Sequence, residues 1–289
     1  MHPRMGRLLA AAQLEEGSDG IWSGRMPAQA SDQSVERVLR ERVAAERYDN
    51  YLAAIAHSHS IPVMDHEVRR FLTQVPPDAL VLDIGGCWGW HWRRLLELRP
   101  DVGIVVIDFV RGNLMHAKQV LGSLVGGQVA LVHADAGALP FPTAAMPDAG
   151  FDAVWTVQVL QHIPDFARAV REAHRVLLPG GRFANYSLHI TPLIRFVCRL
   201  FGKPYHIDGL VNGQFHLTRA DEAQRSVVER MFGAPVTDRY TECLFHPELA
   251  LAFVGRAGSW LGRLDARLSE YAWLGRWAGR QRSFEVVKA

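Results

Sequence analysis

From about residue 79 to residue 187, short apolar runs alternate with segments of helical periodicity. The runs ALVLDI, VGIVVID, QVALVHAD, FDAVWTV and GRFANYSL lack polar alternation, which is typical of parallel strands buried on both faces. The clearest helix spans residues 165–178, where apolar residues share one face and Asp165 is a suitable N-cap. This alternation predicts an α/β fold with a mostly parallel sheet and helices on both faces.

The flanking segments show different patterns. Residues 1–33 lack apolar periodicity and are rich in Gly, Ser, Asp and Gln, so we predict a mobile leader. Residues 34–61 form an N-terminal helical segment, helical from about 35 to 58, and a second helix is predicted from Asp65 to Val75. Beyond residue 188, three helical patterns and two strand-like segments are expected to form a helical cap and the last two strands.

Composition limits the class of protein. The chain has 289 residues, 48% apolar and 21% charged, which is enough for a substantial core. Its net charge is only +2, without a block of like charges, so nucleic acid is not an expected partner. Cys87, Cys198 and Cys243 are too far apart for a disulfide framework or a metal cluster. No run approaches the roughly 20 apolar residues of a membrane span, and no signal peptide is recognised, so we expect a cytoplasmic protein.

The region from residue 253 to residue 280 is rich in arginine and aromatic residues. A basic amphipathic helix can lie on a membrane, although such a helix more often forms a lid with a solvated face. Glycines also argue against one continuous helix. Membrane contact through this region therefore stays open. The residues concerned are Trp260, Tyr271, Trp273, Trp277, Arg256, Arg263, Arg267, Arg276 and Arg280.

The stretch VLDIGGCWGW places a glycine-rich turn directly after the first strand of the alternating region. Such a turn lets the main chain approach a ligand closely, and the N–H groups of the following helix point toward it. The dinucleotide fingerprint would need glycine at the positions of Cys87 and Trp90. The carboxylate of Asp83 would repel a pyrophosphate but can hold an ammonium group. The pattern therefore favours a ligand with a positively charged amino group.

This loop resembles the first motif of the class I S-adenosylmethionine-dependent methyltransferases, an acidic residue followed by x-Gly-x-Gly-x-Gly, with Cys87 in place of the central glycine. Four further motifs resemble the small-molecule, UbiE-like branch in the right order: VVID, HADAGALPF, FDAVWTVQVLQHIPD and REAHRVLLPGGRF. The resemblance covers about residues 79–187. It implies a Rossmann-like sheet of seven strands, a methyltransferase domain at 62–289 with its cofactor-binding core at 79–187, and S-adenosylmethionine as cofactor.

The resemblance also implies roles for individual residues. Asp83 would hold the amino group of the cofactor, Asp108 its ribose hydroxyls, and Asp135 the amino group of adenine, with Phe109 against the adenine ring. His162, at the turn after the fourth strand, is the candidate base or acceptor contact. The implied cofactor-binding residues are Asp83, Gly85, Gly86, Cys87, Gly89, Asp108, Phe109, Asp135, Ala136, Val157 and Gln158.

Each of these residues also has a structural alternative. The acids can cap loops or form an Asx-turn, the phenylalanine can belong to the core, and His162 can satisfy a neighbouring carbonyl. Trp88 and Trp90 are either a wall of the site or packing residues, and Gly86 can supply the conformation that Cys87 disfavours. Histidines 189, 206 and 216 are expected to be surface or structural residues.

Missing motifs narrow the acceptor. TVQV stands where amino-directed DNA methyltransferases carry a Pro-Pro-aromatic run, and the glutamate pair of protein arginine methyltransferases is absent. No acid ends the fourth strand, so we expect no metal, and Gln161 stands where cyclopropane synthases typically have Glu. A small molecule remains: a quinone, sugar, polyketide, other secondary metabolite or lipid, and we expect its methylation at oxygen. A non-catalytic nucleotide-binding domain and an RNA methyltransferase stay open as alternatives.

Overall fold

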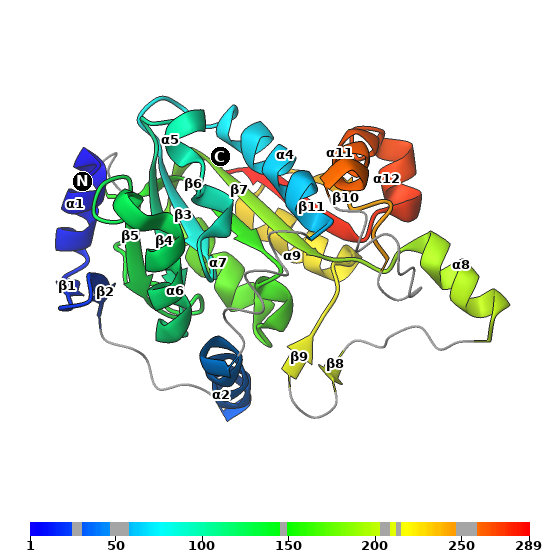
Figure 1. The fold of residues 1–289 in the computed structure, drawn as a ribbon, viewed down its shortest axis with the longest axis horizontal. Helices are drawn as coiled ribbons and strands as arrows, with labels where there is room; N and C mark the ends of the chain where they lie inside the picture. The colour runs from blue at the N-terminus through cyan, green and yellow to red at the C-terminus, as the bar shows by residue number, and fades with distance from the viewer. Residues whose placement is uncertain (25–30, 47–57, 145–148, 203–208, 212–214, 247–258) are drawn as a thin grey trace.

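The computed structural model describes residues 1–24, 31–46, 58–144, 149–202, 209–211, 215–246 and 259–289. In this part of the chain, nine strands form one sheet with helices on both faces (Figure 1). The strand order is β1-β2-β5-β4-β3-β6-β7-β11-β10. The predicted α/β, Rossmann-like class is confirmed, although the sheet has two strands more than the seven predicted.

Five parallel strands form the centre of the sheet. The chain runs from β3 outward through β4 to β5 and then returns to β6 on the other side of β3. The strand order therefore reverses beside β3, and open α/β sheets bind ligands at such a point, outside the carboxyl ends of the strands. The five strands are β5 (Val129–His133), β4 (Gly103–Asp108), β3 (Leu80–Ile84), β6 (Phe151–Val157) and β7 (Leu177–Leu188).

Antiparallel pairs extend both edges of this parallel centre. β11 (Gln281–Val287) lies between β7 and β10 (Thr237–Thr241), antiparallel to both. At the opposite edge, β2 (Ile21–Ser23) is parallel to β5, and β1 (Glu15–Glu16) is antiparallel to β2. These two short strands account for the difference from the predicted seven.

The prediction of a mobile leader is wrong for residues 1–24. Helix α1 (Pro3–Ala11) buries Met5, Leu8 and Leu9 against the sheet, and the side chain of Arg4 pairs with Asp152 at 2.5 Å. The Gly, Ser and Asp residues that suggested disorder belong mainly to the tight turns around β1 and β2. One short helix and two strands of two or three residues give too little periodicity to be recognised.

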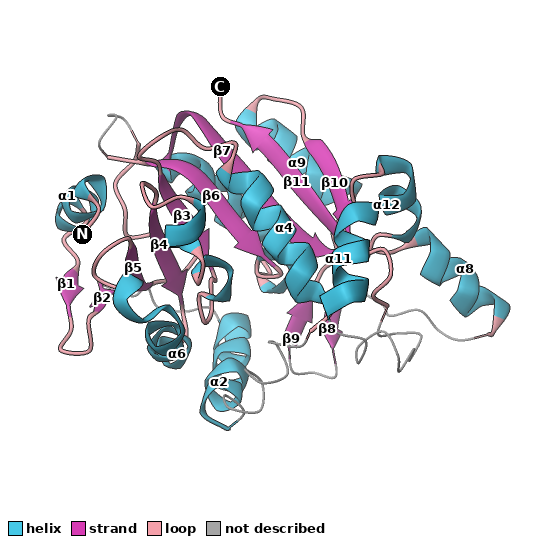
Figure 2. Cartoon of the chain, turned by 45° about the horizontal axis from the view of Figure 1, so that its top comes forward, coloured by secondary structure: helices cyan, strands magenta, loops and turns pink. Residues whose placement is uncertain are grey.

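Helices cover both faces of the sheet (Figure 2). On one face, α4 (Ser60–Leu72) and α6 (Arg111–Leu121), which continues into the 3-10 helix η2 (Gly122–Leu124), pack on a core that includes Trp92 and Trp155. On the other face, α1, α7 (Phe166–Val176) and α9 (Glu222–Phe232) pack on β3, β4, β5 and β7.

Two helix predictions differ from the structure and one agrees closely. Helix α7 matches its prediction, and the Asp165 side chain accepts a hydrogen bond from Arg168 N at 2.9 Å. Helix α4 begins five residues before the predicted start at Asp65. The segment after the glycine loop is not one helix but the 3-10 helix η1 (Trp90–Trp92) and the short α5 (Leu95–Leu98).

The predicted cap is only partly beside the carboxyl ends of the parallel strands. The hairpin of β8 (Gly209–Val211) and β9 (Phe215–Leu217) contacts α2 (Ser31–Glu46) and the 3-10 helix η3 (Leu160–His162). Residues 47–57 of the predicted N-terminal helix lie outside the described part. The helices α8 (Pro192–Leu200), α11 (Ser259–Leu268) and α12 (Ala272–Ala278) lie at the end of the molecule away from α1 (Figure 1). Within the described chain, none of the helices has the length and hydropathy to cross a bilayer.

Candidate functional site

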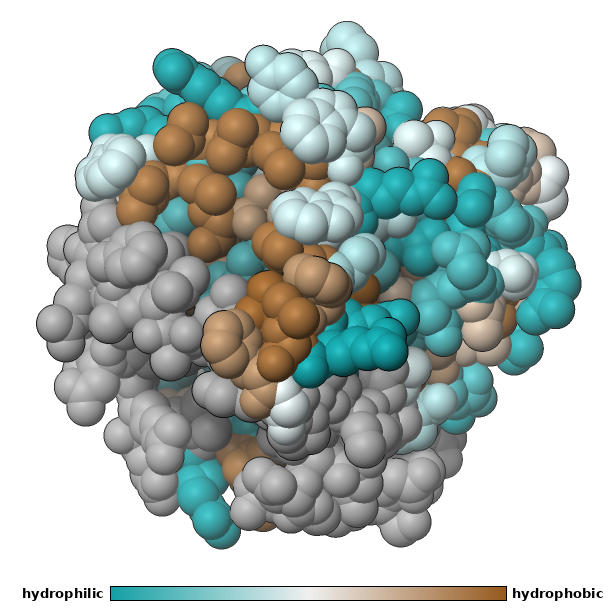
Figure 3. Space-filling view, turned by 90° about the vertical axis from the view of Figure 1, so that its right-hand side faces the viewer, coloured by the Kyte–Doolittle hydropathy of each residue, from teal (hydrophilic) through white to brown (hydrophobic). Residues whose placement is uncertain are grey.

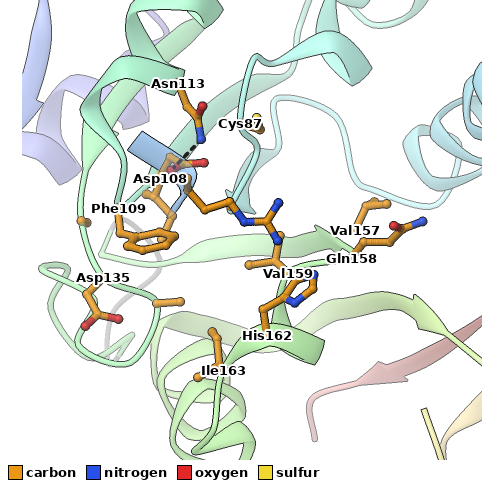
Figure 4. Close-up of a pocket in the computed structure, with 15 residues that line it drawn as sticks. Cys87, Asp108, Phe109, Asn113, Asp135, Val157, Gln158, Val159, His162 and Ile163 are labelled. Carbon is orange, nitrogen blue, oxygen red and sulfur yellow. Dashed lines mark hydrogen bonds between the residues drawn. The ribbon is translucent and has the colours of Figure 1, made fainter. Parts of the chain in front are cut away.

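A cavity of about 340 Å³ lies at the carboxyl ends of β3, β4, β5 and β6 (Figure 4), within the range of roughly 300–1,000 Å³ that small-molecule sites occupy. Nine of the twelve residues proposed from the sequence line it; Asp83, Gly86 and Gly89 do not. The nine are Gly85, Cys87, Asp108, Phe109, Asp135, Ala136, Val157, Gln158 and His162. The lining residues that the sequence analysis missed are Arg40, Ile107, Asn113, Ala134, Val159 and Ile163.

The glycine loop follows β3 closely along the end of β4. Gly85 has a φ of +68° and donates its N–H to Ile107 O at 2.8 Å, and a Cβ added to it would overlap the side chain of Val159. Cys87 has a φ of +50°. The idea that Gly86 takes over the left-handed conformation is therefore wrong, because Cys87 adopts it itself. Gly86 is needed for another reason: a Cβ there would overlap the Asp83 carboxylate.

Asp83 lies behind the loop and not in the cavity wall. Its side chain is buried, and Oδ2 accepts a hydrogen bond from Trp92 Nε1 at 2.6 Å. Burial raises the pKa of Asp83 to about 7, the neighbouring Asp108 acts in the same direction, and the Trp92 bond opposes both. This buried acid therefore supports the loop and places a titratable charge directly beneath it.

Asp108 ends β4 and lines the cavity. Its Oδ1 accepts hydrogen bonds from Val110 N at 2.8 Å and from Asn113 Nδ2 at 3.3 Å. Trp88 Nε1 in turn donates to Asn113 Oδ1 at 3.2 Å, so Trp88 orients the asparagine instead of lining the cavity. Burial raises the pKa of Asp108 to about 6, and the hydrogen bonds from Val110 and Asn113 oppose the shift.

Asp135 and Phe109 complete this wall. Asp135 Oδ1 accepts from Gly137 N at 2.7 Å, so the Asx-turn is present, and the residue also borders the cavity. The ring of Phe109 lies between the carboxylates of Asp108 and Asp135 at the edge of the cavity (Figure 4). One side of the cavity thus offers two carboxylates and a flat apolar ring.

The opposite wall comes from the end of β6 and from η3. Gln158 has a φ of +55°, which is uncommon outside glycine, and its N–H donates to Tyr186 O at 2.7 Å. Val157, Val159 and Ile163 contribute apolar side chains. Backbone in this conformation is often found at functional sites, and here it turns the chain from the sheet into η3.

His162 borders the cavity from η3, and the side chain of Gln161 forms a hydrogen bond with its ring. The buried Gln161 side chain accepts the N–H of Leu188 at its Oε1, at 2.8 Å. Its amide nitrogen therefore faces His162 Nε2, at 3.2 Å. Because an amide N–H₂ can only donate, Nε2 must accept, and the ring proton is assigned to Nδ1. This contact favours the neutral imidazole.

Arg40 reaches the cavity from α2, far from the other lining residues in sequence. Its guanidinium opposes the rise that burial causes in the pKa of Asp108. Burial also raises the pKa of the Cys87 thiol well above its usual range, and Arg40 again acts in the opposite direction. The helical pattern around Arg40 was recognised, but nothing local in the sequence marks this arginine among its neighbours.

The remaining candidates lie away from the cavity. Trp90 packs beneath the guanidinium of Arg93, whose Cζ lies 4.6 Å from the centroid of the Trp90 ring. His189 lies near Ala220 O and Tyr240, in a structural position, while residue 206 and the side chain of residue 216 lie outside the described part. The described residues contain a close group of His66, Glu67 and Glu270. Arg70 and Arg239 already neutralise it.

Comparisons with known proteins agree with this geometry. Residues 82–185 match the family model described as a methyltransferase domain. The stretch contains the glycine loop, Asp108, Asp135 and His162, which are the elements that build the cavity. This part of the chain is therefore similar to a class I S-adenosylmethionine-dependent methyltransferase domain.

Two curated relatives and one solved structure indicate how far the similarity extends. The UbiE C-methyltransferase of ubiquinone/menaquinone biosynthesis from Methylobacterium nodulans is 28% identical over 172 residues, 58% of this chain and 65% of that protein. The 27-O-demethylrifamycin SV methyltransferase of Amycolatopsis mediterranei is 47% identical over 113 residues, 39% of each chain. The matches thus span less than two thirds of either relative.

The solved structure is the 1,6-didemethyltoxoflavin-N1-methyltransferase of Burkholderia thailandensis. It superposes with a TM-score of 0.54 over 92% of this chain and 93% of its own, at 14% sequence identity. At this identity the likeness concerns the fold alone.

The residues of the methyltransferase domain suit the cofactor of the family. A Cβ on Gly85 would overlap Val159 and a Cβ on Gly86 would overlap Asp83, so the loop needs glycine at both positions. Asp83 and Asp108 are buried acids with raised pKa values, and a positively charged ligand would stabilise their ionised forms. The glycine loop and the two buried carboxylates therefore fit a positively charged nucleoside.

Proposed function

We propose that this protein binds S-adenosylmethionine in the described cavity and methylates a small molecule. The observation that carries the proposal is the convergence of the glycine loop, Asp108 and Asp135 on one cavity at the switch point of the sheet. When bound, the cofactor supplies a methyl group on a positively charged sulfur. Asp108 accepts hydrogen bonds from the ribose hydroxyls, Phe109 packs on adenine, and Asp135 accepts from the adenine amino group.

The charged ends of the methionine part are assigned to the loop and to α2. Asp83, beneath the loop, attracts the amino group through the field of its carboxylate. Arg40 provides the only guanidinium among the described cavity-lining residues and attracts the carboxylate. The ligand's amino group then faces the buried Asp83, and its carboxylate faces the half-buried Arg40. These two attractions of opposite sign orient the ligand as well as holding it.

The acceptor is assigned to the wall of β6 and η3. Its apolar side chains suit a molecule with an apolar body, and the more identical of the two relatives bears a name that places its methyl group on an oxygen. We therefore propose O-methylation of a secondary metabolite, quinone, sugar or lipid, without a metal, since Thr156–Gln158 offer no acid at the end of β6. Orientation can supply about 7–11 kcal/mol of barrier lowering, whereas a base at His162 would add about 10²–10⁴-fold.

Two measurements test this proposal in sequence. Calorimetry should show binding of S-adenosylmethionine and of its demethylated product, with no comparable binding of NAD. Incubation with isotopically labelled cofactor and a panel of hydroxylated polyketides and hydroquinones should then yield a methyl ether, identified by mass spectrometry.

The outcomes separate the alternatives. NAD binding without S-adenosylmethionine binding would overturn the assignment of the cavity. Cofactor binding without transfer to any small acceptor would favour a non-catalytic nucleotide-binding domain, and transfer to RNA would replace the proposed acceptor class.

A further inference from the structure

Large apolar side chains gather on the surface of α8, α11 and α12. Thirteen large hydrophobic residues of the described chain are exposed, and eight of them lie on or beside these three helices, including every aromatic residue of that set. Patches of this kind on soluble proteins usually mark an interaction site. The eight residues, here called the aromatic face, are Phe196, Leu200, Phe201, Trp260, Leu264, Tyr271, Trp273 and Trp277.

The helices that carry the aromatic face are anchored to the fold on their inner sides. Ile194 and Cys198 of α8 are buried, and Gly275 of α12 packs against Tyr240 so closely that a Cβ would lie 2.9 Å from it. Helices α8 and α12 also contact each other. Even so, Phe201 is 73% and Trp273 72% exposed. The exposed rings of the aromatic face are therefore carried by helices that are packed firmly on the fold. Figure 3 shows brown apolar and pale aromatic side chains together on this side of the molecule.

Among the described residues of α8, α11 and α12, the exposed charges that form no ion pair are all positive. Arginines 195, 199, 267 and 276 are exposed, and within the described chain they form no ion pair with an acid. The two acids of the same helical region are used elsewhere. Asp265 is buried against His59 Nε2 at 2.8 Å and Cys243 N at 2.7 Å, and Glu270 pairs with His66 and Arg239. The described part of this side thus presents unpaired positive charge, although the chain as a whole carries only +2.

We propose that the aromatic face binds the surface of a bilayer that contains anionic phospholipids. Tryptophan and tyrosine are enriched at the membrane–water interface because their rings are apolar and their N–H or O–H groups stay hydrated. Arginine side chains around them are attracted to lipid phosphates. Because the described helices are unsuited to span a bilayer, the contact is peripheral.

A second copy of the chain is a poorer match for this surface. A two-fold dimer would place the same face against itself, and the exposed arginines would then oppose one another without an unpaired carboxylate among the described residues of these three helices. The charge complementarity therefore favours an anionic lipid surface. This inference is independent of the chemistry assigned to the cavity.

Vesicle co-sedimentation tests the proposal directly. The full chain should bind vesicles of phosphatidylcholine with about one third phosphatidylglycerol at least about tenfold more tightly than pure phosphatidylcholine vesicles. The binding should weaken as salt rises, because the attraction between exposed charges is screened. Tryptophan fluorescence should shift to shorter wavelength on binding.

Two variants and one matched control locate the contact. W273A/W277A removes two rings and R195E/R199E reverses two charges, and each should lower vesicle binding at least about tenfold. The control L96A/R94E makes the same kinds of change on α5, where Leu96 is exposed and Arg94 pairs only with Glu97 among the described residues, and should bind as the parent does. Thermal unfolding and cofactor affinity, measured on every variant, show whether the fold is retained.

Three results would overturn the proposal. The first is equal binding to neutral and anionic vesicles, or none to either. The second is vesicle binding that both variants leave unchanged. The third is self-association of the chain that the two variants abolish. RNA binding that is tighter than vesicle binding at the same salt, and that the two variants abolish, would count equally against the proposal.

Discussion

The cavity wall formed by β3, β4 and β5 holds its polar groups with buried hydrogen bonds, whereas the wall formed by β6 and η3 presents apolar side chains and one histidine. Asp108 in the first wall, and Asp83 behind it, are each held by neighbours within ten residues of the chain. In the second, Gln161 holds His162 while it is itself held by Leu188 of β7. Local contacts thus specify the wall that we assign to the cofactor, and contacts between distant elements specify the wall that we assign to the acceptor.

The largest effect is expected at Asp108. Asp108→Ala should weaken S-adenosylmethionine binding about 100-fold, because hydrogen bonds to a charged group contribute about 1.5–3 kcal/mol each. Calorimetry measures the loss. Asp101→Ala removes a surface acid that pairs with Arg99 and serves as the control. An unchanged affinity in the Asp108 variant would show that the cofactor half is assigned wrongly.

Gly85 is where the two walls touch. Gly85→Ala should destabilise the protein by about 2–5 kcal/mol, since a left-handed non-glycine residue costs about 1–2 kcal/mol and overpacking against Val159 adds about 1–3 kcal/mol. Urea unfolding gives the value. Adding Val159→Ala should recover part of the stability, and a double variant that is no more stable than the single one would argue against the contact.

The raised pKa values of Asp108 in the first wall and of Asp83 behind it predict a pH dependence. Unliganded Asp108 and Asp83 have pKa values of about 6 and 7, so they take up protons as pH falls through this range, and a cationic ligand must then displace those protons. Cofactor affinity should therefore fall with decreasing pH, by up to about tenfold per unit for each carboxylate that must ionise. Calorimetry between pH 8 and about pH 5 measures the slope, which Asp108→Asn should make shallower.

The second wall can be tested at Gln161. Gln161→Glu keeps an acceptor for Leu188 N but replaces the amide donor facing His162 with a second acceptor, which favours a proton on Nε2. If neutral His162 acts as a base, the acidic limb of the pH–kcat profile should move upward by about one unit. A profile identical to that of the parent enzyme would leave His162 a positioning residue at most.

The smallest effect is expected at Cys87, where the chain departs from the family pattern. Cys87→Gly relieves the left-handed strain but makes the unfolded chain more flexible, and the two effects are each about 1 kcal/mol. Stability should therefore change by less than about 1 kcal/mol and cofactor affinity by less than about threefold. A large gain in affinity would show that the thiol obstructs the loop.

The sequence by itself determined the parallel centre of the sheet and most of the residues of the first wall that line the cavity. Apolar runs and glycine spacing express local requirements: a strand buried on both faces needs uninterrupted apolar residues, and a left-handed turn that approaches a ligand favours glycine. Asp108 and Asp135 were found because they follow directly on such runs, and Asp165 because an N-cap acts within one turn.

Only the tertiary structure decided the rest. The α1 helix is held by buried contacts with strands far along the chain, Arg40 reaches the cavity because α2 lies beside β9 and α6, and the hydrogen bonding of His162 depends on Leu188, 26 residues later. The exposure of Trp273 and Phe201 likewise follows from which sides of α12 and α8 pack inward. A local pattern specifies which face of a segment is apolar, but which partner covers that face, or whether any does, is set by the free energy of packing distant segments together.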